Sequence, residues 1–121
     1  MQKLGKREEQ IMQIIWRLKQ AFIKEVIDEL PEPKPHYNTV ATMVKILTEK
    51  GFLSAEKLGN SYRYTPLIPL EDYRKQDVAN IKRKYFGNSF SRMITHFAKE
   101  ENLSDAELDE IISIIKSQKS S

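Results

Sequence analysis

The sequence predicts a mostly α-helical protein in two parts. Hydrophobic residues recur at helical spacing in three segments before a Gly-Asn turn, and in three more after the proline-rich stretch 66–69. Between them the period changes from helical to extended on both sides of Gly59 and Asn60, which predicts a β-hairpin. We therefore expect a domain of three helices and a hairpin at residues 1–69, and a three-helix segment at residues 70–121.

The first part begins with three stretches of helical periodicity. A first helix is expected over residues 6–19 and a shorter second one over residues 23–30, ended by the proline-rich loop 31–35. A third helix is expected over residues 38–50 and stops at Gly51, which can adopt the positive φ of a C′ residue. The inward-facing side chains of the third helix are Val40, Met43, Val44 and Leu47.

The hairpin follows directly after the third helix. Residues 52–58 and 61–65 have extended sequences on either side of Gly59 and Asn60, a two-residue turn in which glycine comes first. Three short helices followed by a hairpin is the element order of a winged helix-turn-helix domain. A small α+β domain of another kind is the alternative.

Composition excludes several classes of protein. The 121 residues include no cysteine, so we expect no disulfide framework, thiolate metal site or catalytic thiol. No apolar run could span a bilayer and the charged first twenty residues lack a secretory h-region, so a cytoplasmic protein is expected. Residues 1–69 carry 11 Lys and Arg against 8 Asp and Glu, whereas residues 70–121 carry 9 of each. The whole net charge of +3 therefore lies in the first part, which permits a nucleic-acid partner there.

The third helix has one side suited to reading DNA. With Val40, Val44 and Leu47 buried, a rotation of about 100° per residue places four polar residues on the opposite side. These are Asn38, Thr42, Lys45 and Glu49. Thr39 lies on a flank at the N-terminus, where free backbone N–H groups favour a phosphate. Short hydrogen-bonding side chains followed by a cation are what a major-groove helix needs, although Glu49 argues against contact by the last turn. An ordinary amphipathic helix is the alternative.

Further DNA-binding candidates surround the tip of the hairpin. They are Lys57, Asn60, Ser61 and Arg63. A projecting ribbon that carries cations suits backbone phosphates or the minor groove. Tyr62 and Tyr64 alternate on one strand face, and we expect them to pack beneath the hairpin rather than to stack on bases.

Residues 70–121 are expected to form three short amphipathic helices. The first ends near Gly87, and the last follows a capping box formed by Ser104 and Glu107. Three such helices enclose little core alone, so their apolar faces need another surface, most simply the same segment of a second copy in a C2 dimer. Folding back on residues 1–69 is the alternative. The expected dimerisation residues are Val78, Ile81, Phe90, Met93, Ile94, Phe97, Leu108, Ile111, Ile112 and Ile115.

No constellation of residues indicates catalysis, a cofactor or a metal. His36 and His96 are 60 residues apart, and the four glycines are scattered at element ends rather than gathered in a phosphate loop. No histidine is placed to activate a serine. We therefore expect neither an enzyme nor a cofactor nor a metal site.

Four groups of residues have the order and spacing of one known family. The matching residues are Leu4, Glu8, Ile11, Met12 and Trp16 in the first helix, Glu25, Val26 and Leu30 in the second, Tyr37, Thr39, Val40, Thr42, Leu47, Lys50 and Gly51 in the third, and Gly59, Tyr62, Tyr64 and Pro66 in the hairpin. On these residues the chain resembles the penicillinase and methicillin-resistance repressors, often grouped with a copper-responsive repressor as BlaI/MecI/CopY. The resemblance covers nearly the whole chain.

The resemblance implies a homodimeric winged-helix transcriptional repressor that binds a palindromic operator on double-stranded DNA. For the β-lactam branch of the family it also implies antibiotic resistance, with release of the repressor by proteolysis that a membrane sensor-protease triggers. The cut in that branch falls at an Asn-Phe bond in the dimerisation helices. The corresponding candidate pair here is His96 and Phe97, which keeps the phenylalanine but not the asparagine.

Two departures from the family pattern bear on function. Asn60 stands where the family usually has a wing-tip arginine, so one phosphate contact is missing or is supplied by Arg63. The copper branch uses a cysteine-rich C-terminal tail, so we do not expect copper sensing of that type in a chain without cysteine. Asn60 and Glu49 together support an alternative function, a winged-helix protein-interaction module that has lost DNA binding.

Overall fold

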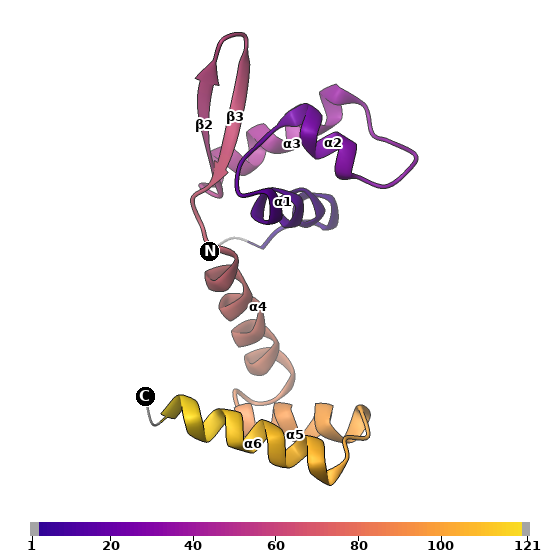
Figure 1. Ribbon diagram of the computed structural model, residues 1–121, viewed down its shortest axis with the longest axis vertical. Coiled ribbons are helices and arrows are strands. Elements are labelled where there is room, and N and C mark those ends of the chain that lie inside the picture. The colour runs from indigo at the N-terminus through magenta and orange to yellow at the C-terminus, as the bar shows by residue number, and fades with distance from the viewer. Residues whose placement is uncertain (1–2, 120–121) are drawn as a thin grey trace. The chain divides into compact units, whose positions relative to one another are not determined.

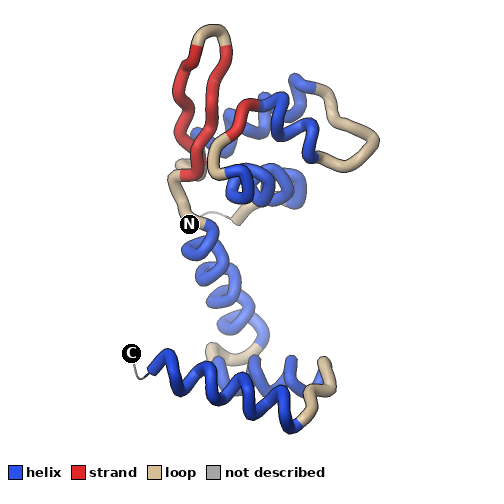
Figure 2. Tube along the Cα trace, viewed as in Figure 1, coloured by secondary structure: helices blue, strands red, loops and turns tan. Residues whose placement is uncertain are grey.

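The computed structural model describes residues 3–119 and confirms the predicted fold class, mostly helical with one small sheet (Figure 1, Figure 2). The chain divides between Gln76 and Asp77 into two compact units. The elements in chain order are α1 (Lys6–Leu18), β1 (Ala21–Phe22), α2 (Ile23–Glu29), α3 (Tyr37–Glu49), β2 (Leu53–Leu58), β3 (Ser61–Pro66), α4 (Leu70–Tyr85), α5 (Phe90–Glu100) and α6 (Asp105–Lys119).

The predicted hairpin is part of a three-stranded antiparallel sheet with the order β1-β3-β2. β2 and β3 pair along their whole length from Leu53 opposite Pro66 to Leu58 opposite Ser61, and Gly59 turns the chain with a φ of 64°. β1 adds two pairs to β3 on the other edge. The sequence does not predict β1, because two residues are too few to display the period of a strand.

The core of the first unit lies between α1, α2, α3 and the start of the hairpin. One stripe of each helix is buried, because apolar residues recur at helical spacing along it. On α3 this stripe is Val40, Val44 and Leu47, each with no exposed surface, as the sequence predicts. The hairpin contributes Leu53 at its base and projects from the helices of this unit (Figure 1).

Tyr73, in the first turn of α4, belongs to the core of the first unit. Its side chain is 7% exposed, and its ring lies 5.5 Å from that of Trp16 and 5.9 Å from that of Phe52. Trp16 in turn donates from Nε1 to the carbonyl oxygen of Ile68 at 2.9 Å. These contacts extend the first unit to Gln76, seven residues beyond the division after residue 69 that the proline-rich stretch suggests.

An ion pair joins the start of α1 to the end of α3. The Lys50 Nζ donates to Glu8 Oε2 at 2.9 Å, and the Gly5 backbone N–H donates to Glu8 Oε1 at 2.9 Å. Burial raises the pKa of the Glu8 carboxyl, but the hydrogen bonds from Gly5 and Lys50 and the charge of Lys50 outweigh it, so the pKa is lowered from 4.5. The pair therefore adds a polar contact to the apolar packing of α1 against α3.

The second unit contains the end of α4 with α5 and α6. Ser89 caps α5 by accepting from the Arg92 backbone N–H at 3.1 Å, and Ser104 accepts from the Glu107 backbone N–H at 3.2 Å, as the predicted capping pattern requires. Among the described residues of this unit, Met93 is the only hydrophobic residue in the buried class. The unit therefore has very little core of its own.

No helix within residues 3–119 is long and apolar enough to cross a bilayer.

Candidate nucleic-acid interface

The loop before α3 is fastened to the end of α2. The Lys34 Nζ donates to the carbonyl oxygens of Asp28 at 2.8 Å and Leu30 at 2.6 Å, two acceptors near the helix end. A cation at a helix C-terminus also interacts favourably with the helix dipole. These hydrogen bonds hold the loop that leads into α3. The buried stripe of α3 then determines which side of the helix is exposed.

The first turn of α3 offers backbone donors. His36 is the N-cap residue, and its side chain makes no capping hydrogen bond. The first backbone hydrogen bond of the helix runs from the Val40 N–H to the His36 carbonyl oxygen at 3.2 Å. The N–H groups of residues 37–39 therefore have no partner within the helix, which is the arrangement that binds phosphate in many proteins.

The outer side of α3 carries the four predicted helix contacts. Asn38, Thr42 and Lys45 are exposed on the side opposite the core stripe, and Thr39 is exposed on a flank of that side. Glu49, in the last turn, is exposed on the same side. The Thr42 Oγ1 donates to the Asn38 carbonyl oxygen at 2.9 Å, so its hydroxyl is turned back onto the helix. The structure brings these four residues together on one surface, and their contact with DNA stays a prediction.

Sequence reasoning did not single out one exposed residue of this surface, Ile46. Its side chain is 38% exposed and follows Thr42 by one helical turn. The rotation of about 100° per residue already places Ile46 outside the core stripe. An isoleucine next to apolar neighbours is typical of a core residue, so the sequence pattern alone does not mark Ile46 as exposed.

The hairpin has two different faces. Leu53 points to the core, and alternation along the strands places Lys57 of β2 and Tyr62 of β3 on the same face as Leu53. Burial raises the pKa of Tyr64, also on this face, and the neighbouring Tyr37 and Tyr62 raise it further. Lys57 therefore lies on the face of the hairpin whose base packs into the core.

The expected packing of the two tyrosines is correct only for Tyr64. Tyr64 is half-buried, whereas Tyr62 is 47% exposed because it lies beyond the helices, toward the tip of the hairpin. Lys57, Asn60 and Ser61 are exposed around the same tip. These three predicted contacts are therefore accessible together.

Arg63 lies apart from the other predicted wing contacts. It occupies the face of the sheet opposite Lys57, directly across from Glu56 on β2 and from Phe22 on β1. Its Nη2 donates to Glu56 Oε2 at 3.1 Å, and its Nε is buried without a hydrogen-bond partner. Arg63 thus pairs with a residue of the protein itself. Its side chain does not lie at the wing tip, so it does not take the place of the arginine that Asn60 replaces.

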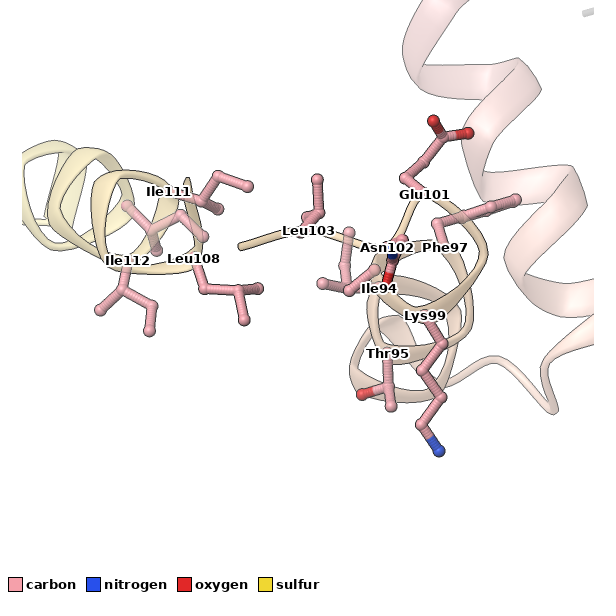
Figure 3. A pocket seen from close by; sticks show the side chains of 12 residues that line it. Ile94, Thr95, Phe97, Lys99, Glu101, Asn102, Leu103, Leu108, Ile111 and Ile112 are labelled. Carbon is pink, nitrogen blue, oxygen red and sulfur yellow. The ribbon is translucent and has the colours of Figure 1, made fainter. Parts of the chain in front are cut away.

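The second unit carries an apolar pocket between α5 and α6 with a volume of about 790 Å³ (Figure 3). Figure 3 shows Ile94 of α5 and Leu108 of α6 on facing sides of it, with Leu103 between them. Six of the ten predicted dimerisation residues line the pocket: Ile94, Phe97, Leu108, Ile111, Ile112 and Ile115. Val78, Ile81 and Phe90 are exposed outside it, and Met93 is buried within the unit.

The candidate cleavage pair lies in the middle of α5. The His96 ring lies 5.4 Å from that of Phe86 and 5.4 Å from that of Phe97, and both side chains of the pair remain about half exposed. The peptide bond between them is helical. A protease that needs an extended substrate would therefore require α5 to unfold locally.

Within the described part of the chain, no three His, Asp or Glu side chains gather as a metal site would require.

Three helices, a two-stranded wing and an exposed polar helix face together define a winged helix-turn-helix protein. The sequence profile of the penicillinase repressor family matches residues 4–117. The chain belongs to this family, which consists of DNA-binding transcriptional repressors rather than enzymes.

Relatives match over nearly the full length of the chain. The methicillin resistance regulatory protein MecI of Staphylococcus aureus (strain N315) is 26% identical over 114 residues, which covers 93% of each chain. The penicillinase repressor of Bacillus licheniformis is 27% identical over 118 residues, which covers 97% of this chain and 92% of the relative.

Two solved structures each resemble 60% of the chain. The solution structure of the DNA-binding domain of the repressor BlaI is 34% identical with a TM-score of 0.52, and covers 60% of this chain and 94% of that one. The monomeric form of Bacillus licheniformis BlaI in complex with the blaP half-operator is 33% identical with a TM-score of 0.50, and covers 60% of this chain and 89% of that one.

Proposed function

We propose that this protein is a homodimeric repressor that binds a palindromic operator, with one α3 helix in the major groove of each half-site. The observation that carries the proposal is the outer surface of α3. The backbone N–H groups of its first turn have no partner within the helix, and the exposed side chains of Asn38, Thr42 and Lys45 lie along the same surface. Backbone donors of this kind position a helix on phosphates, and short polar side chains then reach base edges. Lys57, Asn60 and Ser61 would contact the DNA backbone beside the groove.

The relative bound to DNA supports one half-site for each winged domain. That solved structure holds the monomeric form of BlaI in complex with a half-operator. If the same arrangement holds here, two copies related by a two-fold axis would cover a palindrome, because operator symmetry mirrors protein symmetry.

The apolar surface of α5 and α6 supports self-association. Phe97, Ile112 and Ile115 are each nearly half exposed, although a soluble monomer rarely exposes a large contiguous apolar patch. Among its described residues the second unit buries only Met93, so a second copy is the occupant that would complete its core. A dimer would also raise the affinity of two weakly charged winged domains for DNA through effective concentration.

The test is selection of duplexes from a random library by the full-length protein, followed by sedimentation of the complex. We expect an inverted repeat to be recovered and two chains to bind each duplex. Thr42→Ala and Lys45→Ala should each reduce discrimination between the recovered duplex and random DNA, since a good base contact is worth about 1–3 kcal/mol. Recovery of no preferred sequence, or of a single asymmetric site by one chain, would contradict the proposal.

A second candidate function is a protein-interaction module that keeps the winged-helix shape without binding DNA. Two carboxylates favour it, Glu49 on the outer side of α3 and Glu56 beside Arg63 on the wing. A DNA affinity that falls steeply between low and physiological salt supports the repressor, since phosphate contacts release counterions. No binding to any duplex at low salt would support the interaction module.

We further propose that the DNA complex is released when a membrane sensor-protease cuts the chain between His96 and Phe97. A cut there would separate most of α5 from α6 and so divide the pocket that the two helices form. Incubation with the cognate protease and mass spectrometry of the products would test this step. A cut at another bond, or no cut while a known substrate is cleaved, would exclude this pair.

A further inference from the structure

The outer side of α3 has two chemically different flanks. Asn38 and Lys45, seven residues apart, lie along one line on the helix surface, and both can donate hydrogen bonds. Thr39 and Ile46, also seven residues apart, lie along a parallel line, with Thr42 between the two lines. One flank is therefore polar, and the other carries methyl groups.

The hydrogen bond of Thr42 strengthens this division. Its hydroxyl donates to the Asn38 carbonyl oxygen at 2.9 Å, so the methyl group is the part of this exposed side chain that remains available to a partner. Ile46 lies one turn farther along, 38% exposed, whereas the core residues on either side of it in sequence, Val44 and Leu47, have no exposed surface. Packing of the core therefore does not account for an isoleucine at position 46.

One apolar group is presented by the base pairs in the major groove. It is the C5-methyl group of thymine, which side-chain methyl groups recognise by direct contact. Isoleucine has no hydrogen-bonding group with which to read any other base edge. From these observations we infer that Ile46, supported by the Thr42 methyl group, recognises the 5-methyl group of a thymine in each half-site. The inference rests on the proposed function and names a specificity-determining residue of the same site.

The test compares thymine with uracil, which has the same hydrogen-bonding groups and lacks the methyl group. The probe is the duplex that the wild-type protein recovers from a random library, resynthesised with deoxyuridine at one thymine position at a time. We expect substitution at one position, or two adjacent positions, in each half-site to weaken wild-type binding about fourfold per methyl group removed. Binding should be insensitive to substitution at the other positions.

The variant Ile46→Ala should lose this sensitivity, so that it binds the thymine and uracil duplexes equally. Ile46→Val keeps both branches at Cβ and loses only the terminal Cδ1 methyl group, so it should retain part of the preference. Lys45→Ala is the matched control from the other flank, because it should weaken binding to both duplexes while leaving their ratio unchanged. Position 46 is exposed, and circular dichroism with thermal unfolding would verify that each variant folds.

The outcomes separate the inference from the proposed function. Equal wild-type binding to thymine and uracil duplexes at every position, or an unchanged ratio in Ile46→Ala, overturns the inference while DNA binding stands. If no duplex is recovered at all, the proposed function fails and the inference fails with it.

Discussion

The Arg63 guanidinium donates to the Glu56 carboxylate at 3.1 Å across neighbouring strands of the wing. Both residues lie on the face of the sheet opposite Lys57, so the two charges cancel where a phosphate contact would otherwise be available. Lys57 is exposed and forms no ion pair within the described residues. The wing therefore presents one free cation, Lys57, on the face that it shares with Leu53.

This arrangement predicts unequal effects of replacing the two wing cations. Lys57→Gln should reduce the slope of log affinity against log salt by about one, because one phosphate contact is lost. Arg63→Gln should change the slope by much less, since Glu56 already neutralises its charge. Fluorescence anisotropy titrations at four or more salt concentrations measure both slopes. Equal slopes for the two variants would show that Arg63 breaks its ion pair with Glu56 and contacts DNA instead.

The same pair predicts that Glu56 lowers the affinity for DNA. Glu56→Gln should leave Arg63 free to contact phosphate, so that binding at low salt tightens about threefold and the salt slope steepens, an effect of the size expected for an exposed ion pair. The double variant Glu56→Gln with Arg63→Gln is the control and should lose that gain. An unchanged affinity in Glu56→Gln would mean that the face carrying Arg63 does not approach DNA.

The ion pair between Glu8 and Lys50 predicts a pH dependence of stability. The folded-state pKa of Glu8 is lowered, so its ionised form stabilises the protein above the unfolded-state value of 4.5, and this contribution is lost as the pH falls through the folded-state pKa. Urea unfolding of wild type and Glu8→Gln should therefore differ most near neutral pH and converge in acid. A difference that stays constant down to pH about 3 would contradict a lowered pKa.

A charge in the pocket between α5 and α6 should prevent self-association. Ile112→Glu would place an unpaired carboxylate in the proposed interface, which costs about 3 kcal/mol or more. Ser113→Glu is the matched control, because the neighbouring Ser113 is exposed on α6 and does not line the pocket. Analytical ultracentrifugation should show monomers for Ile112→Glu and dimers for Ser113→Glu, and dimers for both would place the interface elsewhere.

The local elements of this fold could be predicted from the sequence because each has a clear signal. Helical periodicity and Gly51 define α3, and the Gly59-Asn60 turn with extended flanks defines the hairpin. The strand β1 has only two residues and no period, and the burial of Tyr73 depends on long-range contacts with Trp16 and Phe52.

The candidate site was predictable along α3 but only in part on the wing. A helix with a known buried stripe fixes its exposed side, so the outer residues of α3 follow from spacing alone. The position of Arg63 depends on the strand register that sets it opposite Glu56, and the exposure of Tyr62 depends on how far the hairpin extends past the helices. Neither property is local to the sequence around those residues.

The most direct test of the proposed repressor measures how its affinity depends on the arrangement of two half-sites. The recovered duplex would be compared with one that has a single half-site and with one in which about 5 base pairs, half a helical turn, are inserted between the half-sites. We predict that the full-length protein binds the intact inverted repeat about 100-fold more tightly than either altered duplex, because the second winged domain then binds at high effective concentration. Equal affinity for all three duplexes would contradict a dimer that places two α3 helices on one operator.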